Sequence, residues 1–249
     1  MEIEHRGECT YITALYNIQT PDTRDHAGLQ KRIDLLEKLF LLNIRIIAFM
    51  DPEYRDLIQE NKYPNVKIIY REIETFQIWK MCHENKLELP NSRNTGKDTL
   101  GFLTLMNMKI EFVREGLEYC TTPIIGWIDG SIYHIVHNEE NVKRVLEKEA
   151  RVGNRIKIPG PIKISEHETP IIVLANQIQW KFCGGIFQGH REKIEEFYTT
   201  SMEHLERWIE RGHITWEVNV WIGIAYENKE MFEWVYGDHN DSMLMLNDM

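Results

Sequence analysis

A carboxylate follows an apolar run at Trp127-Ile128-Asp129-Gly130. The run at 124–128 predicts a central strand, and Asp129 then stands at its carboxyl end, where open α/β sheets bind ligands. An isolated charge there costs on the order of several kcal/mol unless a metal, a hydrogen-bond donor or water compensates it. Asp129 therefore predicts a ligand site, with a helix N-cap or a turn before Gly130 as the alternative.

Three basic residues are candidates for binding a phosphate. Lys109 lies in a predicted helix with apolar neighbours, so its charge either reaches solvent as a surface lysine or meets a phosphate. Arg24 and Arg32 are further phosphate candidates, although surface salt bridges would also explain them.

Glu217 and Trp216 open another predicted helix. A glutamate is favoured at a helix start by the dipole and needs no function there. Trp216 offers an aromatic face on which a sugar ring can stack. Gly184 and Gly185 leave room for a close approach to a ligand, or else mark a β-bulge.

The elements that must position these residues alternate in the first part of the chain. Helical and strand periodicities predict strands at 10–16, 45–50 and 66–70, with a helix at 28–43 and a short helix at about 53–61. This order is typical of a doubly wound α/β sheet. No G-x-G-x-x-G occurs, so a dinucleotide-dependent dehydrogenase has no support.

The second part of the chain has weaker patterns. Residues 74–98 are predicted to be irregular, 153–170 to be loop or edge strand, 171–175 to be a strand, and 236–241 to be loop. A glycine-rich strand is predicted at 182–189. Helices are predicted at 99–119, 139–151, 190–211 and 215–228.

The composition restricts the function classes. The 249 residues are 43% hydrophobic and suit one globular domain, and the formal net charge is −10. This charge disfavours nucleic-acid binding, and an anionic nucleotide sugar would need a divalent cation or local Lys and Arg residues.

The cysteines and the hydropathy point to a cellular location. Cys9, Cys82, Cys120 and Cys183 are scattered and form no metal-type spacing, which suits a reducing compartment. The charged start MEIEHRGECT and the lack of a long apolar run predict a cytoplasmic protein without an integral membrane segment.

A series of short motifs resembles a known family. They are Thr10 to Ile18, Ala48 to Asp51, Asn107 to Lys109, Trp127 to Gly130, Gly184-Gly185, Trp216-Glu217 and Tyr236 to His239. In this order they resemble the HtrL/YibB-like glycosyltransferases, over most of the chain. The resemblance implies one GT-A (Rossmann-like) α/β domain over residues 1–249, with a mixed, mostly parallel sheet flanked by helices. Residues 1–135 would bind the nucleotide and 136–249 the acceptor.

The resemblance also implies a binding site for a nucleotide-diphosphate sugar donor. The first strand would cradle the base and ribose, and Asn107 and Lys109 would face the nucleotide sugar. The residues implied in nucleotide-sugar binding are Thr13, Ala14, Leu15, Tyr16, Asn17, Asn107, Lys109, Trp127, Ile128, Asp129, Gly184, Gly185 and Trp216.

A metal is implied as well. Asp129 would be the surviving carboxylate of a D-x-D motif and, with His239, would hold Mn²⁺ or Mg²⁺, with Asp238 as a fallback ligand. Ser131 stands in place of the second acid, and a serine is a poorer ligand for a hard cation. An exposed terminal histidine is the alternative for His239.

Glu217 is implied to be the catalytic residue. It would take the proton of a hydroxyl on a glycan or glycoconjugate acceptor if the anomeric centre inverts, or orient the acceptor if it is retained. Two other functions are open: a sugar-nucleotide nucleotidyltransferase, which usually needs a more glycine-rich loop than NIQTPDTRDHAG, and a catalytically silent nucleotide-sugar-binding module.

Overall fold

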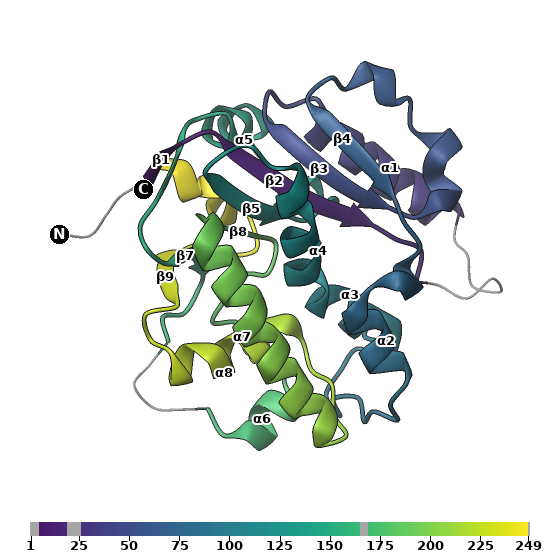
Figure 1. Cartoon of the computed structure of the whole chain (residues 1–249), viewed down its shortest axis with the longest axis vertical. Coiled ribbons are helices and arrows are strands. Elements are labelled where there is room, and N and C mark those ends of the chain that lie inside the picture. The colour runs from purple at the N-terminus through teal and green to yellow at the C-terminus, as the bar shows by residue number, and fades with distance from the viewer. Residues whose placement is uncertain (1–4, 19–25, 165–168, 249) are drawn as a thin grey trace.

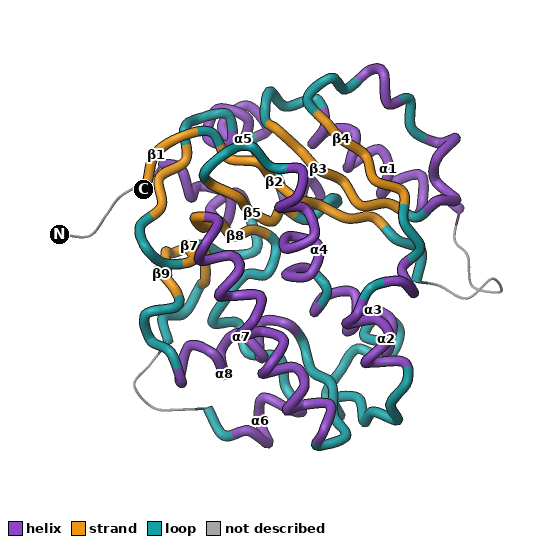
Figure 2. The backbone as a smooth tube through the Cα atoms, in the orientation of Figure 1, coloured by secondary structure: helices purple, strands orange, loops and turns teal. Residues whose placement is uncertain are grey.

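A computed structural model of the chain describes residues 5–18, 26–164 and 169–248. Its centre is a twisted seven-stranded sheet, drawn in orange in Figure 2. From one edge to the other, the order is β4 (Val66–Tyr70), β3 (Arg45–Met50), β2 (Cys9–Leu15), β5 (Ile124–Ile128), β8 (Ile186–His190), β7 (Ile156–Gly160) and β9 (Phe232–Tyr236).

The sheet is mixed but mostly parallel. β2 pairs in parallel with β3 and β5, β3 with β4, and β7 with β9. β8 is antiparallel to both β5 and β7. The α/β fold class with a mixed, mostly parallel sheet flanked by helices is therefore confirmed. A second, two-stranded sheet pairs β1 (His5–Gly7) with β6 (Ala150–Val152).

Helices cover both faces of the large sheet (Figure 1). Alternating side chains of β2 show how the faces divide: Tyr11 and Leu15 pack in one core and Ile12 in the other. The core around Tyr11 includes α1 (His26–Phe40) and α5 (Glu139–Leu146). The core around Ile12 includes α2 (Gln77–His83), α3 (Leu100–Asn107), α4 (Lys109–Gly116), α6 (Ile171–Asn176), α7 (Arg191–Glu210) and α8 (Glu217–Glu227).

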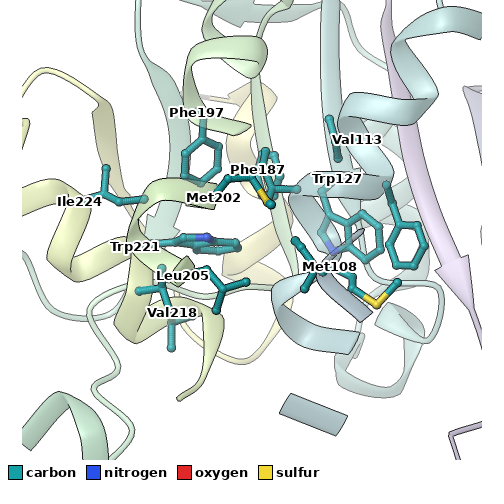
Figure 3. Packing of buried hydrophobic residues seen from close by; sticks show 14 of the residues in the cluster. Met108, Val113, Trp127, Phe187, Phe197, Met202, Leu205, Val218, Trp221 and Ile224 are labelled. Carbon is teal, nitrogen blue, oxygen red and sulfur yellow. The ribbon is translucent and has the colours of Figure 1, made fainter. Parts of the chain in front are cut away.

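Large apolar side chains fix α7 and α8 against the sheet. The ring centroid of Trp221 in α8 lies 5.6 Å from that of Phe187 in β8, with the two rings nearly perpendicular. It lies at the same distance from the ring centroid of Phe197 in α7. Figure 3 shows these rings packed with Leu205 and Val218. Because α8 begins at Glu217, this packing fixes where that carboxylate lies.

The structure corrects three predictions in the weakly patterned parts of the chain and contains one strand that was not predicted. Residues 171–175 form helix α6 and not a strand, because Pro170 precedes the run and only one side of it, at Leu174 and Ala175, is buried. The stretch 153–170 contains β7, which lies inside the sheet between β8 and β9. The stretch 74–98 contains α2, and a further strand, β9, lies before the loop at 236–241.

Most other elements agree with the sequence to within a few residues. The predicted helix at 99–119 is divided into α3 and α4 at Met108, and the short helix at 53–61 consists of 3-10 turns at Pro52–Leu57 and Glu60–Lys62. The four cysteines are free and buried. Among the described residues, no helix is long and apolar enough to cross a membrane.

Candidate functional site

The sheet brings three segments together at one edge. β2 and β5 are parallel, so both end at this edge, at Leu15 and Ile128. β8 runs the other way, so its start is opposite the end of β5, with Ile186 paired to Ile128. The two glycines before β8 therefore lie beside Asp129, whose backbone N–H donates to the Gly185 carbonyl over 2.8 Å. The predicted ligand edge thus contains Asp129, Gly184 and Gly185.

Two helices begin at the same place and supply the other charged groups. Lys109 is the first residue of α4 and Glu217 is the first residue of α8. Asn107 joins these two helix starts, because its amide donates to the carbonyls of Leu103 and Thr215 over 2.8 and 2.9 Å. Asn107 is buried and lines neither of the two cavities at this edge. Its hydrogen bonds instead fix the position of α3 relative to α8.

The Lys109 ammonium lies between two carboxylates. Its Nζ is 3.1 Å from Asp129 Oδ1 and 2.9 Å from Glu217 Oε1, and it donates to the Gly184 carbonyl over 2.9 Å. Three acceptors match the three protons of an ammonium group. Lys109 is therefore satisfied by the protein itself, and two carboxylates with one ammonium leave this triad with one negative charge.

Burial makes the Lys109–Asp129–Glu217 triad strongly coupled. The side chains of Lys109 and Glu217 are 2% and 7% exposed, whereas that of Asp129 is 28% exposed. Burial by itself would lower the pKa of Lys109, but the carboxylates of Asp129 and Glu217 outweigh it and raise that pKa. The lysine therefore stays charged at neutral pH.

Trp127 orients the exposed member of the triad. Its indole Nε1 donates to Asp129 Oδ1 over 2.7 Å. Glycine is required at 184, because a Cβ there would lie 2.2 Å from Glu217 Oε1 and 3.2 Å from Lys109 Nζ. The Trp127 indole and the Gly184 carbonyl therefore hold the triad by hydrogen bonds, and the lack of a side chain at Gly184 leaves room for it.

Two cavities meet at Asp129. The first, of about 420 Å³, lies beside the end of β2 and the helix α1. The second, of about 320 Å³, lies beside the start of α8. Both are lined by Asp129 and by a further shared set of residues: Lys97, Phe102, Met106 and His134. We call them the α1 cavity and the α8 cavity.

The predicted site residues divide between these cavities. The α1 cavity is lined by Ala14, Leu15, Tyr16, Trp127 and Asp129. The α8 cavity is lined by Lys109, Asp129, Gly184, Gly185, Trp216, Glu217 and His239. Thr13, Asn17, Asn107 and Ile128 line neither one, and Thr13 and Ile128 are fully buried. The ligand roles given to these residues stay predictions.

The cavity walls include two residues without a clear signal in the sequence, Lys31 and Trp180, beside the predicted phosphate candidate Arg32. Lys31 and Arg32 line the α1 cavity and form no ion pair with another described residue. Trp180 lines the α8 cavity from the loop after α6. The other predicted phosphate candidate, Arg24, lies outside the described residues.

The described residues do not form a metal site by themselves. Among the described residues, no group of three or more His, Cys, Asp or Glu side chains could hold an ion. The Asp129 carboxylate is already bound by Lys109 and Trp127, and a cation there would lie beside the ammonium. His239 lies in the α8 cavity against Trp180, with its Nδ1 3.3 Å from Asp238 Oδ1. Binding of Mn²⁺ or Mg²⁺ stays a prediction.

Comparison with known proteins gives only distant likenesses. No family model matches the chain, and no curated protein matches it. The resemblance to the HtrL/YibB-like family therefore stays a prediction.

Three solved structures show a loose similarity. The bifunctional IspDF of Campylobacter jejuni is 10% identical with a TM-score of 0.40, over 94% of this chain and 51% of that one. The 4-diphosphocytidyl-2C-methyl-D-erythritol synthase of Anaerococcus prevotii is 12% identical with a TM-score of 0.42, over 97% and 94%. Rv0371c of Mycobacterium tuberculosis is 9% identical with a TM-score of 0.41, over 98% of both chains.

This chain thus spans about half the length of the bifunctional IspDF. At TM-scores of 0.40 to 0.42, however, these likenesses carry no conclusion about the reaction of this chain.

Proposed function

We propose that this chain is a transferase acting on a nucleotide-linked sugar, with the donor in the α1 cavity and a carbohydrate acceptor in the α8 cavity. The observation that carries the proposal is that both cavities are lined by one accessible carboxylate, Asp129. A transfer between two substrates needs their reacting atoms side by side, and two cavities that meet at a charged group provide this arrangement.

The α1 cavity suits the donor. Ala14, Leu15 and Tyr16 supply the end of a strand on which a base and ribose can rest. Lys31 and Arg32 place two positive charges in the cavity wall, although the formal charge of the chain is −10. A diphosphate needs such a locally positive surface. Lys97 adds a third cation where the two cavities join.

The α8 cavity suits the acceptor. In the proposed reaction, the oxygen of an acceptor hydroxyl forms a bond to the anomeric carbon, and the bond from that carbon to the diphosphate oxygen breaks. Glu217 takes the hydroxyl proton, and the nucleoside diphosphate leaves with the bonding electron pair. Lys109 holds the Glu217 carboxylate in place through the 2.9 Å contact and is a positioning residue.

One observation favours a second candidate, nucleotidyl transfer. Three cations, Lys31, Arg32 and Lys97, line the α1 cavity, and this number suits a nucleoside triphosphate as well as a diphosphate. In that reaction a phosphate oxygen of the second substrate would attack the α-phosphorus and displace pyrophosphate. Sugar transfer remains our first candidate, because the α8 cavity offers three carboxylates and two tryptophans, which suit hydroxyl groups and sugar rings better than a phosphate.

The products distinguish these reactions. Candidate nucleotide sugars, and separately nucleoside triphosphates with sugar phosphates, are incubated with the protein, with Mn²⁺ or with a chelator. Release of nucleoside diphosphate supports sugar transfer, release of pyrophosphate supports nucleotidyl transfer, and binding without either product indicates a silent module.

Asp129→Asn with a matched variant tests the site itself. Asp51 also follows a strand at this edge, but its carboxylate caps the 3-10 turn at Pro52–Leu57, and it lines neither cavity. A nucleoside diphosphate should raise the melting temperature of the wild type and of Asp51→Asn, because a ligand of the native state stabilises it. Asp129→Asn should lose the shift. If no common nucleotide shifts the wild type at several millimolar, the proposed function is wrong.

A further inference from the structure

The α8 cavity contains a large aromatic side chain that packing does not explain. Trp180 is 43% exposed, whereas Trp216 in the same cavity is 5% exposed. An exposed tryptophan in the wall of a cavity leaves apolar surface in water that a ligand can cover. Trp180, and not Trp216, therefore offers its ring to an occupant of this cavity.

The Trp180 ring contacts a histidine, and the loop that carries it is bonded to α8. The His239 imidazole lies 4.3 Å away, centre to centre, at an interplanar angle of 81°. On the other side of the loop, the backbone N–H of Gln179 donates to Asn219 Oδ1 over 2.9 Å. Asn219 is the third residue of α8, and its amide also donates to the carbonyls of Leu174 and Gln177. Trp180 is thus tied to the helix that begins with Glu217.

The charges of the cavity indicate what kind of molecule fits. Its lining contains three carboxylates, of Asp98, Asp129 and Glu217, and two ammonium groups, of Lys97 and Lys109, which leaves one negative charge. All three protons of Lys109 are used by protein acceptors. A carboxylate or phosphate in this cavity would meet like charges, whereas hydroxyl groups can donate to Asp129 and Glu217.

From the exposed ring and this charge we infer that the second substrate is a neutral hexose unit that stacks on Trp180 and turns a hydroxyl toward Glu217. The inference rests on the proposed function and names its acceptor class. The apolar face of a pyranose matches the indole, and its hydroxyl groups match the carboxylates. Trp180 then selects for ring-shaped acceptors, while the triad selects against anionic ones.

Saturation-transfer NMR with simple probes tests this without knowledge of the donor. The probes are methyl β-D-galactopyranoside and methyl α-D-glucopyranoside, with methyl β-D-glucuronide as the anionic counterpart. We expect at least one neutral glycoside to bind, and to bind more tightly than the glucuronide. Equal or tighter binding of the glucuronide would overturn the inference, as would no binding of either neutral probe at tens of millimolar.

Variants then assign the binding to Trp180. Trp180→Ala should lower the affinity for the neutral glycoside about tenfold, equal to about 1.4 kcal/mol, and Trp180→Phe should retain most of the affinity. The matched control is Tyr236→Ala, since Tyr236 is 58% exposed but does not line the α8 cavity. Unchanged affinity in Trp180→Ala would overturn the inference. The nucleotide-induced melting shift, measured on the same variants, tests the donor site separately, so the two proposals can fail independently.

Discussion

The two cavities that meet at Asp129 hold their charges in different ways. In the α1 cavity, Lys31 is exposed and Arg32 is partly exposed, and neither is in an ion pair with another described residue. In the α8 cavity, Lys109 and Glu217 are buried and form an ion pair, with Nζ 2.9 Å from Oε1. Exposed cations can follow a flexible ligand at little structural cost, whereas a buried pair has fixed geometry and supports the fold.

This difference predicts two kinds of mutational response. Changes in the α8 cavity should affect the reaction rate and the free energy of unfolding together. Changes in the α1 cavity should affect only the affinity for the nucleotide.

Glu217→Gln should lower sugar transfer by about 10²–10⁴-fold, because it keeps the size of the side chain but removes the proton acceptor. Donor affinity should barely change. The measurement is a transfer assay paired with nucleotide calorimetry, and Glu227→Gln, at the other end of α8 and outside both cavities, is the matched control. Near wild-type transfer would remove Glu217 from the mechanism and leave Asp129 as the candidate base.

Lys109→Met should destabilise the fold by about 3–5 kcal/mol, because it leaves two carboxylates near each other without their shared ammonium. Urea unfolding measures this, with Lys143→Met, an exposed lysine on α5, as control. Adding Glu217→Gln to Lys109→Met should recover part of the loss. A double variant as unstable as the sum of the two single variants would show that the charges are not coupled.

The same lysine predicts how stability depends on pH. The pKa of Lys109 is raised above its ordinary value in the folded state, so its contribution is complete below the unfolded pKa. It is lost only as the pH rises through the higher folded value. The deficit of Lys109→Met should therefore stay constant between about pH 7 and 9, and a deficit that shrinks across this window would contradict the assignment.

Gly184→Ala should cost about 1–3 kcal/mol and most of the transfer activity, because the new Cβ would lie 2.2 Å from Glu217 Oε1. Gly185→Ala is the matched comparison. Its Cβ would meet the flexible Met243 side chain at 2.7 Å, which can move aside more easily. Equal loss of activity in both variants would show that the loss comes from a change in the backbone and not from the contact with Glu217.

Lys31→Ala and Arg32→Ala should each weaken nucleoside diphosphate binding about tenfold and flatten its salt dependence. Their free energies of unfolding should remain within about 0.5 kcal/mol of the wild type, because both residues lie at the surface. Lys62→Ala, an exposed lysine outside both cavities, is the control. A large stability loss in Arg32→Ala would remove the contrast between the two cavities.

Local patterns in the sequence are enough to predict the parallel part of the sheet and the position of Asp129. Strands at 10–16 and 45–50 and the run before Asp129 are almost wholly buried, and residues buried on both faces leave continuous apolar runs. The edge strand at 66–70 is only partly buried and is recognised by its β-branched and aromatic residues. Parallel strands end at one edge, so the position of Asp129 followed from its strand. The run at 171–175 shows the limit of such patterns, since its β-branched residues form a helix in their tertiary surroundings.

The contacts of Lys109, in contrast, depend on long-range packing. Its partners lie 20 and 108 residues further along the chain, at Asp129 and Glu217. The antiparallel β8 and the break between α3 and α4 bring them together, and no local periodicity encodes either feature. Trp180 follows the same rule, because its exposure depends on a loop tied to α8 through Asn219. Local sequence specifies which element a residue joins, whereas long-range packing decides which charges share a cavity.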